Sequence, residues 1–319
     1  MKSKSPSKLT SIFIDSRRTQ PGLVITRGRF KAAVFIGALS TVLVAGGATY
    51  NWNPSASSTT WNTNDTTIWQ EAIAWTNDAG SPNAASFGGA GKSITLGVPI
   101  TAGGLTVASG TGSVRYKISG STLTLAGTTP TISTPTNATI ASTLAGTSGF
   151  TKSGVARLTL SGVNTSLSGP VVISGGPAVS ASGLGLNAAV IISNVNAFGT
   201  GPITIGAVPN LRAIEFSLTG GATFTNDISL PTDPAAVQVG IQGNSSSSSY
   251  QLAGKISGGS TGLTFFFDMG NQQSAGITRL SNPNNDFVVA TNHVNRGVLA
   301  ITADSVLGNP GNVLKTYQN

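Results

Sequence analysis

Short runs in which apolar residues alternate with serine or threonine recur along the chain after residue 86. Such alternation is typical of a half-buried β-strand, because successive side chains of a strand point to opposite sides of the sheet. Glycine, proline or asparagine separates the runs, and no interval has apolar residues at helical spacing. The pattern predicts an all-β fold, with strands within residues 93–97, 104–107, 122–127, 158–162 and 203–206.

Two long stretches of the chain carry similar motifs in the same order. The first spans residues 144–199, and the second, which is more divergent, spans residues 252–308. The spacing of the motifs varies, as expected where strands are fixed by stacking on their neighbours and insertions go into the turns. The repeats favour a right-handed parallel β-helix, a solenoid of stacked turns. A β-sandwich is the alternative, because short strands separated by glycine turns also fit that fold.

The clearest motifs lie in the first repeat. They are Phe-Thr-Lys-Ser-Gly at 150–154, Leu-Thr-Leu-Ser-Gly-Val-Asn-Thr at 158–165 and Gly-Pro-Val-Val-Ile-Ser-Gly-Gly at 169–176. This series resembles the autotransporter-associated β-strand repeat of bacterial passenger-type proteins, and the chain departs from that pattern at 177–179 and 265–268. The resemblance implies an exported structural or adhesive β-helix protein of the bacterial surface or extracellular space, with no catalysis and no cofactor.

The positive charge of the chain is concentrated at its amino terminus. The formal net charge is +8 at pH 7, and residues 1–48 hold eight lysines and arginines against Asp15, which leaves +1 for the remainder. That remainder has no basic stripe interleaved with aromatic residues, so binding to nucleic acid by neutralising its phosphates is excluded.

The basic amino-terminal segment passes into an uncharged apolar run at 32–44, followed by small residues up to Ala48. This order of basic, apolar and small residues predicts a signal peptide at 1–48 that is cleaved near Ala48. The alternative, an uncleaved anchor, is disfavoured because the apolar run is shorter than the roughly 20 residues that a spanning helix needs. The protein would then meet the membrane only transiently, through this leader.

A tryptophan- and asparagine-rich segment at 49–86 contains all four tryptophans, Trp52, Trp61, Trp69 and Trp75. We expect it to cap a solenoid at 87–319, because the open end of a solenoid exposes unpaired strand edges. Contact with a cell-surface or extracellular polysaccharide through these flat rings is the alternative. Since neither a membrane barrel nor a sorting tail precedes Asn319, the chain is expected to be a fragment or a freely secreted form.

Residues that could carry chemistry are few. The chain has no cysteine and one histidine, His293, which is expected in an exposed turn, so a zinc or haem site is not predicted. The acidic residues are scattered, and only Asp268 and Arg279 are candidates for a catalytic pair. We therefore predict no catalytic, cofactor or metal site. A polysaccharide lyase or hydrolase, or a carbohydrate-binding β-helix protein, is the alternative.

Overall fold

The computed structural model describes residues 47–108, 115–177, 188–218, 220–244, 248–269 and 276–316. The predicted signal peptide at 1–48 lies outside this range apart from its last two residues. Across the described residues the only helix is a short 3-10 helix, η1 (Asp304–Leu307), and every pairing between strands is parallel. The prediction of an all-β parallel β-helix is confirmed, and the β-sandwich alternative, which requires antiparallel sheets, is wrong.

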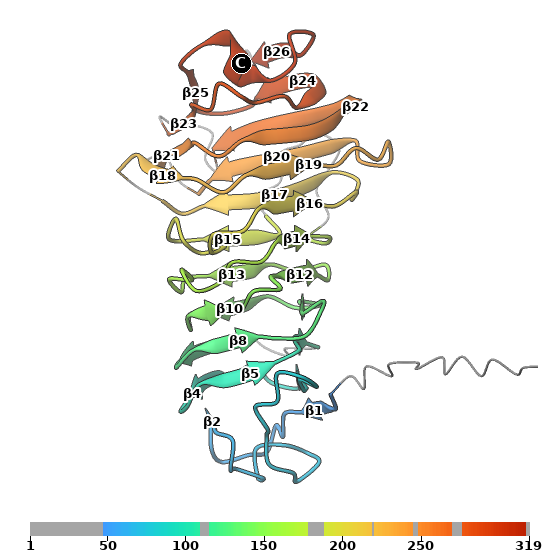
Figure 1. Ribbon diagram of the computed structural model, residues 1–319, viewed down its shortest axis with the longest axis vertical. Coiled ribbons are helices and arrows are strands. Elements are labelled where there is room, and N and C mark those ends of the chain that lie inside the picture. Colours follow the sequence, from blue (N-terminus) through green and yellow to red (C-terminus); the bar gives the residue numbers. More distant parts are fainter. Residues whose placement is uncertain are drawn as a thin grey trace, which may run out of the picture. The chain divides into compact units, whose positions relative to one another are not determined.

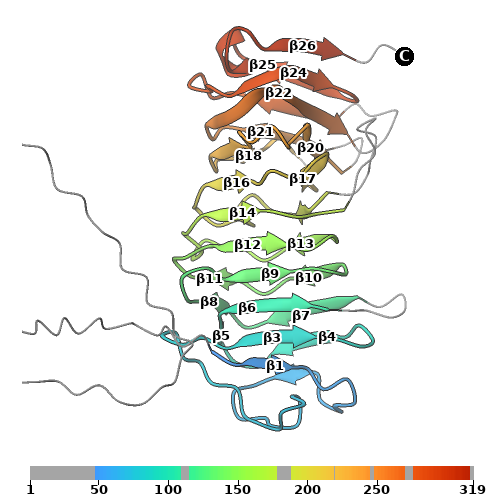
Figure 2. The ribbon, with the colours of Figure 1, turned by 90° about the vertical axis from the view of Figure 1, so that its right-hand side faces the viewer.

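Most turns of the solenoid contribute a strand to each of two long faces, and many also contribute a third short strand (Figures 1 and 2). The strands of the first face are β1 (Thr49–Asn51), β3 (Ala84–Phe87), β6 (Gly104–Val107), β9 (Thr131–Ser133), β12 (Phe150–Ser153), β14 (Val171–Ile173), β16 (Ile203–Ile205), β19 (Ile228–Leu230) and the start of β22 (Ile256–Met269).

The strands of the second face are β2 (Thr60–Trp61), β4 (Ser93–Leu96), β7 (Tyr116–Gly120), β10 (Ala138–Ile140), β13 (Leu158–Leu160), β15 (Val190–Ile192), β17 (Leu211–Phe216), β20 (Gln238–Gly243), the end of β22, β24 (Val288–Val294) and β26 (Val313–Thr316). The third strands form two short sheets, one of β5 (Ile100–Ala102), β8 (Leu123–Leu125) and β11 (Leu144–Ala145), the other of β18 (Ala222–Phe224), β21 (Ser249–Leu252), β23 (Ile277–Leu280) and β25 (Val298–Ile301).

The strand β22 joins the first two faces. It pairs with β19 through Ile256 and with β20 through Phe267, and its register against β24 shifts between Ser260 and Thr264. The two long faces therefore form one continuous sheet of 19 strands. This is also where the chain departs from the motif of the first repeat, since residues 265–267 continue a strand around the corner instead of starting a new one.

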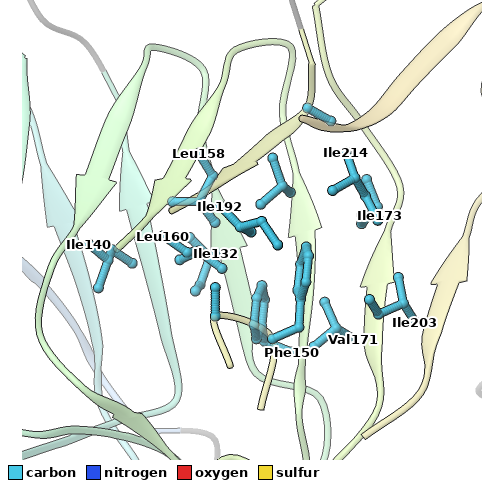
Figure 3. Packing of buried hydrophobic residues seen from close by; sticks show 14 of the residues in the cluster. Ile132, Ile140, Phe150, Leu158, Leu160, Val171, Ile173, Ile192, Ile203 and Ile214 are labelled. Atoms are coloured by element: carbon cyan, nitrogen blue, oxygen red, sulfur yellow. The ribbon is translucent and has the colours of Figure 1, made fainter. Parts of the chain in front are cut away.

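The core is built from ladders of inward-facing apolar side chains. In the strands β9 to β16 every second residue is buried, as the alternating pattern predicts, and the buried residues of one turn pair with those of the next. The two long faces supply opposite walls of this core. Figure 3 shows Phe150, Val171 and Ile203 from the first face and Leu158, Ile192 and Ile214 from the second.

Buried asparagines connect successive turns at two of the corners. The side chain of Asn164 accepts a hydrogen bond from Leu144 N (2.7 Å) in the turn before and donates one to Ala197 O (2.6 Å) in the turn after. Asn285 makes a similar pair of contacts at another corner, between the third strands and the first face, with Ile256 N and Val306 O, both at 2.8 Å. The aligned motifs of the two repeats therefore occupy different faces, since residues 158–160 lie on the second face and residues 278–280 on the third strands. At both corners the amides satisfy backbone groups that a turn would otherwise bury unpaired.

The lysine of the Thr-Lys-Ser motif points into the core. Lys152 is fully buried in a ladder between Ile132 and Ile173, where its Nζ donates hydrogen bonds to the carbonyl oxygens of Gly154 (3.0 Å), Ala156 (2.7 Å) and Gly175 (2.7 Å). Burial lowers the pKa of this amine from 10.5 to about 8. Its role is to bind carbonyl groups at the corner between the two long faces.

Because Lys152 binds fewer protons when folded than when unfolded between about pH 8 and 10.5, its contribution to the free energy of unfolding should rise with pH in that window. We expect the difference in unfolding free energy between the native protein and Lys152→Met to increase by up to about 3 kcal/mol across it. Denaturant titrations at several pH values measure this difference. It should be constant below the window, and a constant difference throughout would show that the amine keeps its ordinary pKa.

Candidate functional site

The four tryptophans lie in the core of the first turn. Each ring is at most 1% exposed. Trp61 makes edge contacts with Trp69 and Trp75, with ring centroids 5.2 and 4.7 Å apart, and Trp52 packs on Phe87 of β3 at 5.8 Å. Offset and edge contacts of this kind are the arrangements that aromatic rings prefer. None of the four rings presents a face to solvent, so the geometry gives no support to carbohydrate contact through them.

Three charged residues of the described part of the chain form a cluster on the outer side of the second face. Asp268 of β22 lies between two arginines, with Arg212 Nη2 2.7 Å from its Oδ2 and Arg296 Nε 2.7 Å from its Oδ1. Arg296 Nη2 also donates to Oδ2 at 2.8 Å, which completes a two-point contact. These side chains point away from the apolar core, yet Asp268 is 0% and Arg212 2% exposed. The cluster is therefore a buried ion network of three groups.

Local backbone structure brings this network together. Arg212 and Gly240 are paired across β17 and β20, and a Cβ atom on residue 240 would lie 2.6 Å from Arg212 Cδ. The glycine leaves room for the arginine to cross β20 and reach Asp268 on the next strand. Burial alone would raise the pKa of the Asp268 carboxyl, but the hydrogen bonds from Arg296 and the charge of Arg212 hold it below its usual value.

A second carboxyl group lies in the same outward column. Glu215 is paired with Gln242, and Gln242 with Asp268, so one strand separates the two carboxyl groups. Burial raises the pKa of Glu215, whose carboxylate accepts a hydrogen bond from Gln242 Nε2. Two carboxyl groups with opposite pKa shifts are found in glycosidases, where they face a cleft that holds the sugar. Here both are buried, and neither lines a hollow described below, so the geometry does not favour hydrolysis.

The candidate pair Asp268 and Arg279 is not formed. Arg279 lies on β23 of the third strands and is exposed, whereas Asp268 is bound by Arg212 and Arg296. Neither of those two arginines was anticipated from the sequence. The prediction that His293 lies in an exposed turn is also wrong. His293 lies in strand β24, and its ring packs on the ring of Phe266 with centroids 4.8 Å apart. Partial burial lowers the pKa of His293, and the charge of Lys315 adds to this effect.

The surface of the described residues includes two open hollows. One, of about 500 Å³, is lined by small residues that include Gly47, Pro82, Gly103 and Gly127, without an ionisable side chain. The other, of about 480 Å³, lies over β16, β19 and the start of β22. Its lining combines the hydroxyl-bearing Thr204, Ser229 and Thr232 with Asp233 and with the apolar Ala207, Ile205, Leu230 and Pro231.

Within the residues that the structure describes, no three histidine or acidic side chains come together as a metal-binding group. The same part of the chain holds no apolar helix of membrane-spanning length. No cofactor can be assigned to either hollow from its lining residues.

Comparison with known proteins gives one informative similarity. The chain is 32% identical over 271 residues to the adhesin BmaC autotransporter of Brucella suis biovar 1 (strain 1330). The similarity covers 85% of this chain but 6% of that protein, so the chain spans a small part of this relative's length. No family model matches the chain. No solved structure matches it either.

Proposed function

We propose that this chain, a distant homologue of part of an autotransporter adhesin, is an exported adhesive or structural β-helix protein of the bacterial surface or extracellular space. The observation that carries the proposal is the similarity to an adhesin over 85% of the chain. The fold supports it, since the stacked turns that the structure describes present a repetitive surface. The finer assignment, to the autotransporter-associated β-strand repeat, is part of this proposal and rests on the motifs at 150–176.

Two amino-terminal segments of the chain have separate roles in this proposal. Residues 1–48 act as a cleaved signal peptide, because their basic, apolar and small residues follow one another in the order that a signal peptidase substrate requires. Residues 49–86 form the first turn and cap the turns that follow, and the packing of Trp52 and Trp61 on Phe87 supports this role. A cap of this kind prevents end-to-end pairing of exposed strands.

Export and adhesion can be tested with the full chain in a bacterial host. The released protein should begin near Thr49 when its amino terminus is sequenced. Beads coated with it should be retained on cultured animal cells or on extracellular polysaccharide far better than beads coated with the same protein unfolded by guanidinium, because adhesion depends on the folded surface.

An intact Met1 on the released protein would contradict the cleaved leader. Equal retention of the folded and unfolded coatings would contradict the adhesive role. Release of sugar fragments from uronate or neutral polysaccharides by the folded protein would replace the proposal by the enzyme alternative.

A further inference from the structure

The outer side of the first face is uncharged. From β3 to the start of β22, all outward positions of the described strands carry small or uncharged side chains, while the alternate residues point into the core. Most of these outward residues bear hydroxyl groups, namely Ser86, Thr106, Thr131, Ser133, Thr151, Ser153, Thr204, Ser229 and Ser257.

The outward positions within these strands carry no charge, and the charged residues Asp227, Asp233 and Lys255 lie beyond the strand ends, at the edge of this surface. The one lysine on these strands before β22, Lys152, lies between Thr151 and Ser153 and is turned inward, where it binds three backbone carbonyl groups. By contrast, the outer side of the second face carries Lys117 and the Asp268 network. The two long faces therefore offer chemically different surfaces.

The hollow of about 480 Å³ lies on the uncharged surface. Thr204 and Ser229 face it from paired positions on β16 and β19, and Ser229 Oγ is 3.4 Å from Ser257 Oγ on β22. Asp233 is exposed at its rim, where its Oδ1 accepts a hydrogen bond from Ala235 N at 2.8 Å. A carboxylate has further lone pairs with which to accept hydrogen bonds from a ligand.

This combination of groups restricts the ligand. Phosphate or acidic polymers require cations, and the outward positions within the strands of this face have none, while Lys255 at its edge is paired with Asp286. A lipid surface requires apolar side chains, and Val172 is the main one in the outward rows. Hydroxyl rows repeated at about 4.8 Å along a sheet, a concave apolar wall and one carboxylate suit a ligand that is itself rich in hydroxyl groups. Many weak contacts along such a polymer add up to stable attachment.

We infer that the outer side of the first face binds an uncharged polysaccharide, with one sugar unit held in the hollow beside Thr204 and Asp233. This inference rests on the proposed adhesive function and gives it a partner. Sugar hydroxyls donate to the carboxylate of Asp233 and exchange hydrogen bonds with Thr204 and Ser229, while the sugar ring lies against Ala207 and Pro231. The polymer continues along the hydroxyl rows of the turns below.

The test is sedimentation of the exported protein with insoluble cellulose, with insoluble β-1,3-glucan and with calcium pectate as the acidic polymer. At least one of the neutral polymers should bind. Thr204→Lys and Asp233→Ala should each weaken that binding about tenfold or more, which corresponds to about 1.4 kcal/mol.

Two matched variants control for general effects. Thr159→Lys makes the same change on the outer side of the second face, and Asp65→Ala removes a carboxylate that makes the same local contact, to Thr67 N at 2.8 Å, in the cap. Both should bind like the native protein. Equal loss in the controls, or binding to pectate alone, would overturn the inference. Absence of polysaccharide binding with retained bead adhesion to cells would overturn it and leave the proposed function intact, whereas loss of both would overturn both.

Discussion

Replacing Asp268 by alanine should lower the free energy of unfolding by about 3–5 kcal/mol, because it leaves buried arginines without their counter-charge. Asp268 is fully buried and is the carboxylate that Arg212 and Arg296 share, at 2.7 Å from each. A guanidinium group cannot lose its proton at accessible pH, so the folded state would have to keep two uncompensated cations or open to water. Chemical denaturation followed by circular dichroism measures the loss.

The chain provides a matched control for this prediction in an exposed ion pair. Lys255 Nζ lies 2.6 Å from Asp286 Oδ2, and the two side chains are 40% and 59% exposed. Asp286→Ala should therefore cost less than about 1 kcal/mol. Similar effects of Asp268→Ala and Asp286→Ala would mean that the Asp268 network is open to solvent, contrary to its burial.

Gly149→Ala should destabilise the stack even more strongly, by about 5 kcal/mol or more, which is exceptional for a single substitution. Gly149 has a φ of +67°, and an added Cβ would lie 1.7 Å from Pro170 O. That oxygen belongs to the next turn and accepts a hydrogen bond from Phe150 N. The added methyl group would therefore push apart two turns at the start of β12 and β14.

Gly221→Ala separates backbone strain from this clash. Gly221 has a φ of +71°, close to that of Gly149, but an added Cβ would meet nothing within 4 Å. The cost there should be only that of a left-handed alanine, about 1–2 kcal/mol. If both variants unfold at the same denaturant concentration, close contact between turns is not what requires glycine at position 149.

The fold follows from features that are local in the sequence. Period-two alternation located strands such as β4, β6 and β13, because each buries one row of side chains and exposes the other. The hydrogen bonds at the corners between faces could not be predicted from the sequence. The contacts of Asn164 with the turns on both sides depend on turn length, and the aligned motif of the second repeat lies on the third strands instead of the second face.

The Asp268 network could not be predicted because the turn length changes along the chain. Paired residues are 20 apart between Ala138 and Leu158, but 27 apart between Ile214 and Ile241. With the longer spacing known, Glu215, Gln242 and Asp268 fall into one column, and Arg296 lies 28 residues beyond Asp268. The four tryptophans identify a distinct segment, but the amino-acid composition of that segment does not indicate whether the rings face inward or outward.

The parallel stacking of turns has a mechanical consequence. Hydrogen bonds between successive turns run along the direction of stacking, so a pull in that direction loads the bonds of the terminal turn first and detaches one turn at a time. Each detached turn of 20–35 residues releases about 70–120 Å of extended chain in place of a rise of about 4.8 Å. A protein attached at one end and bound to a surface would therefore lengthen stepwise under load and limit the force that reaches its binding contacts.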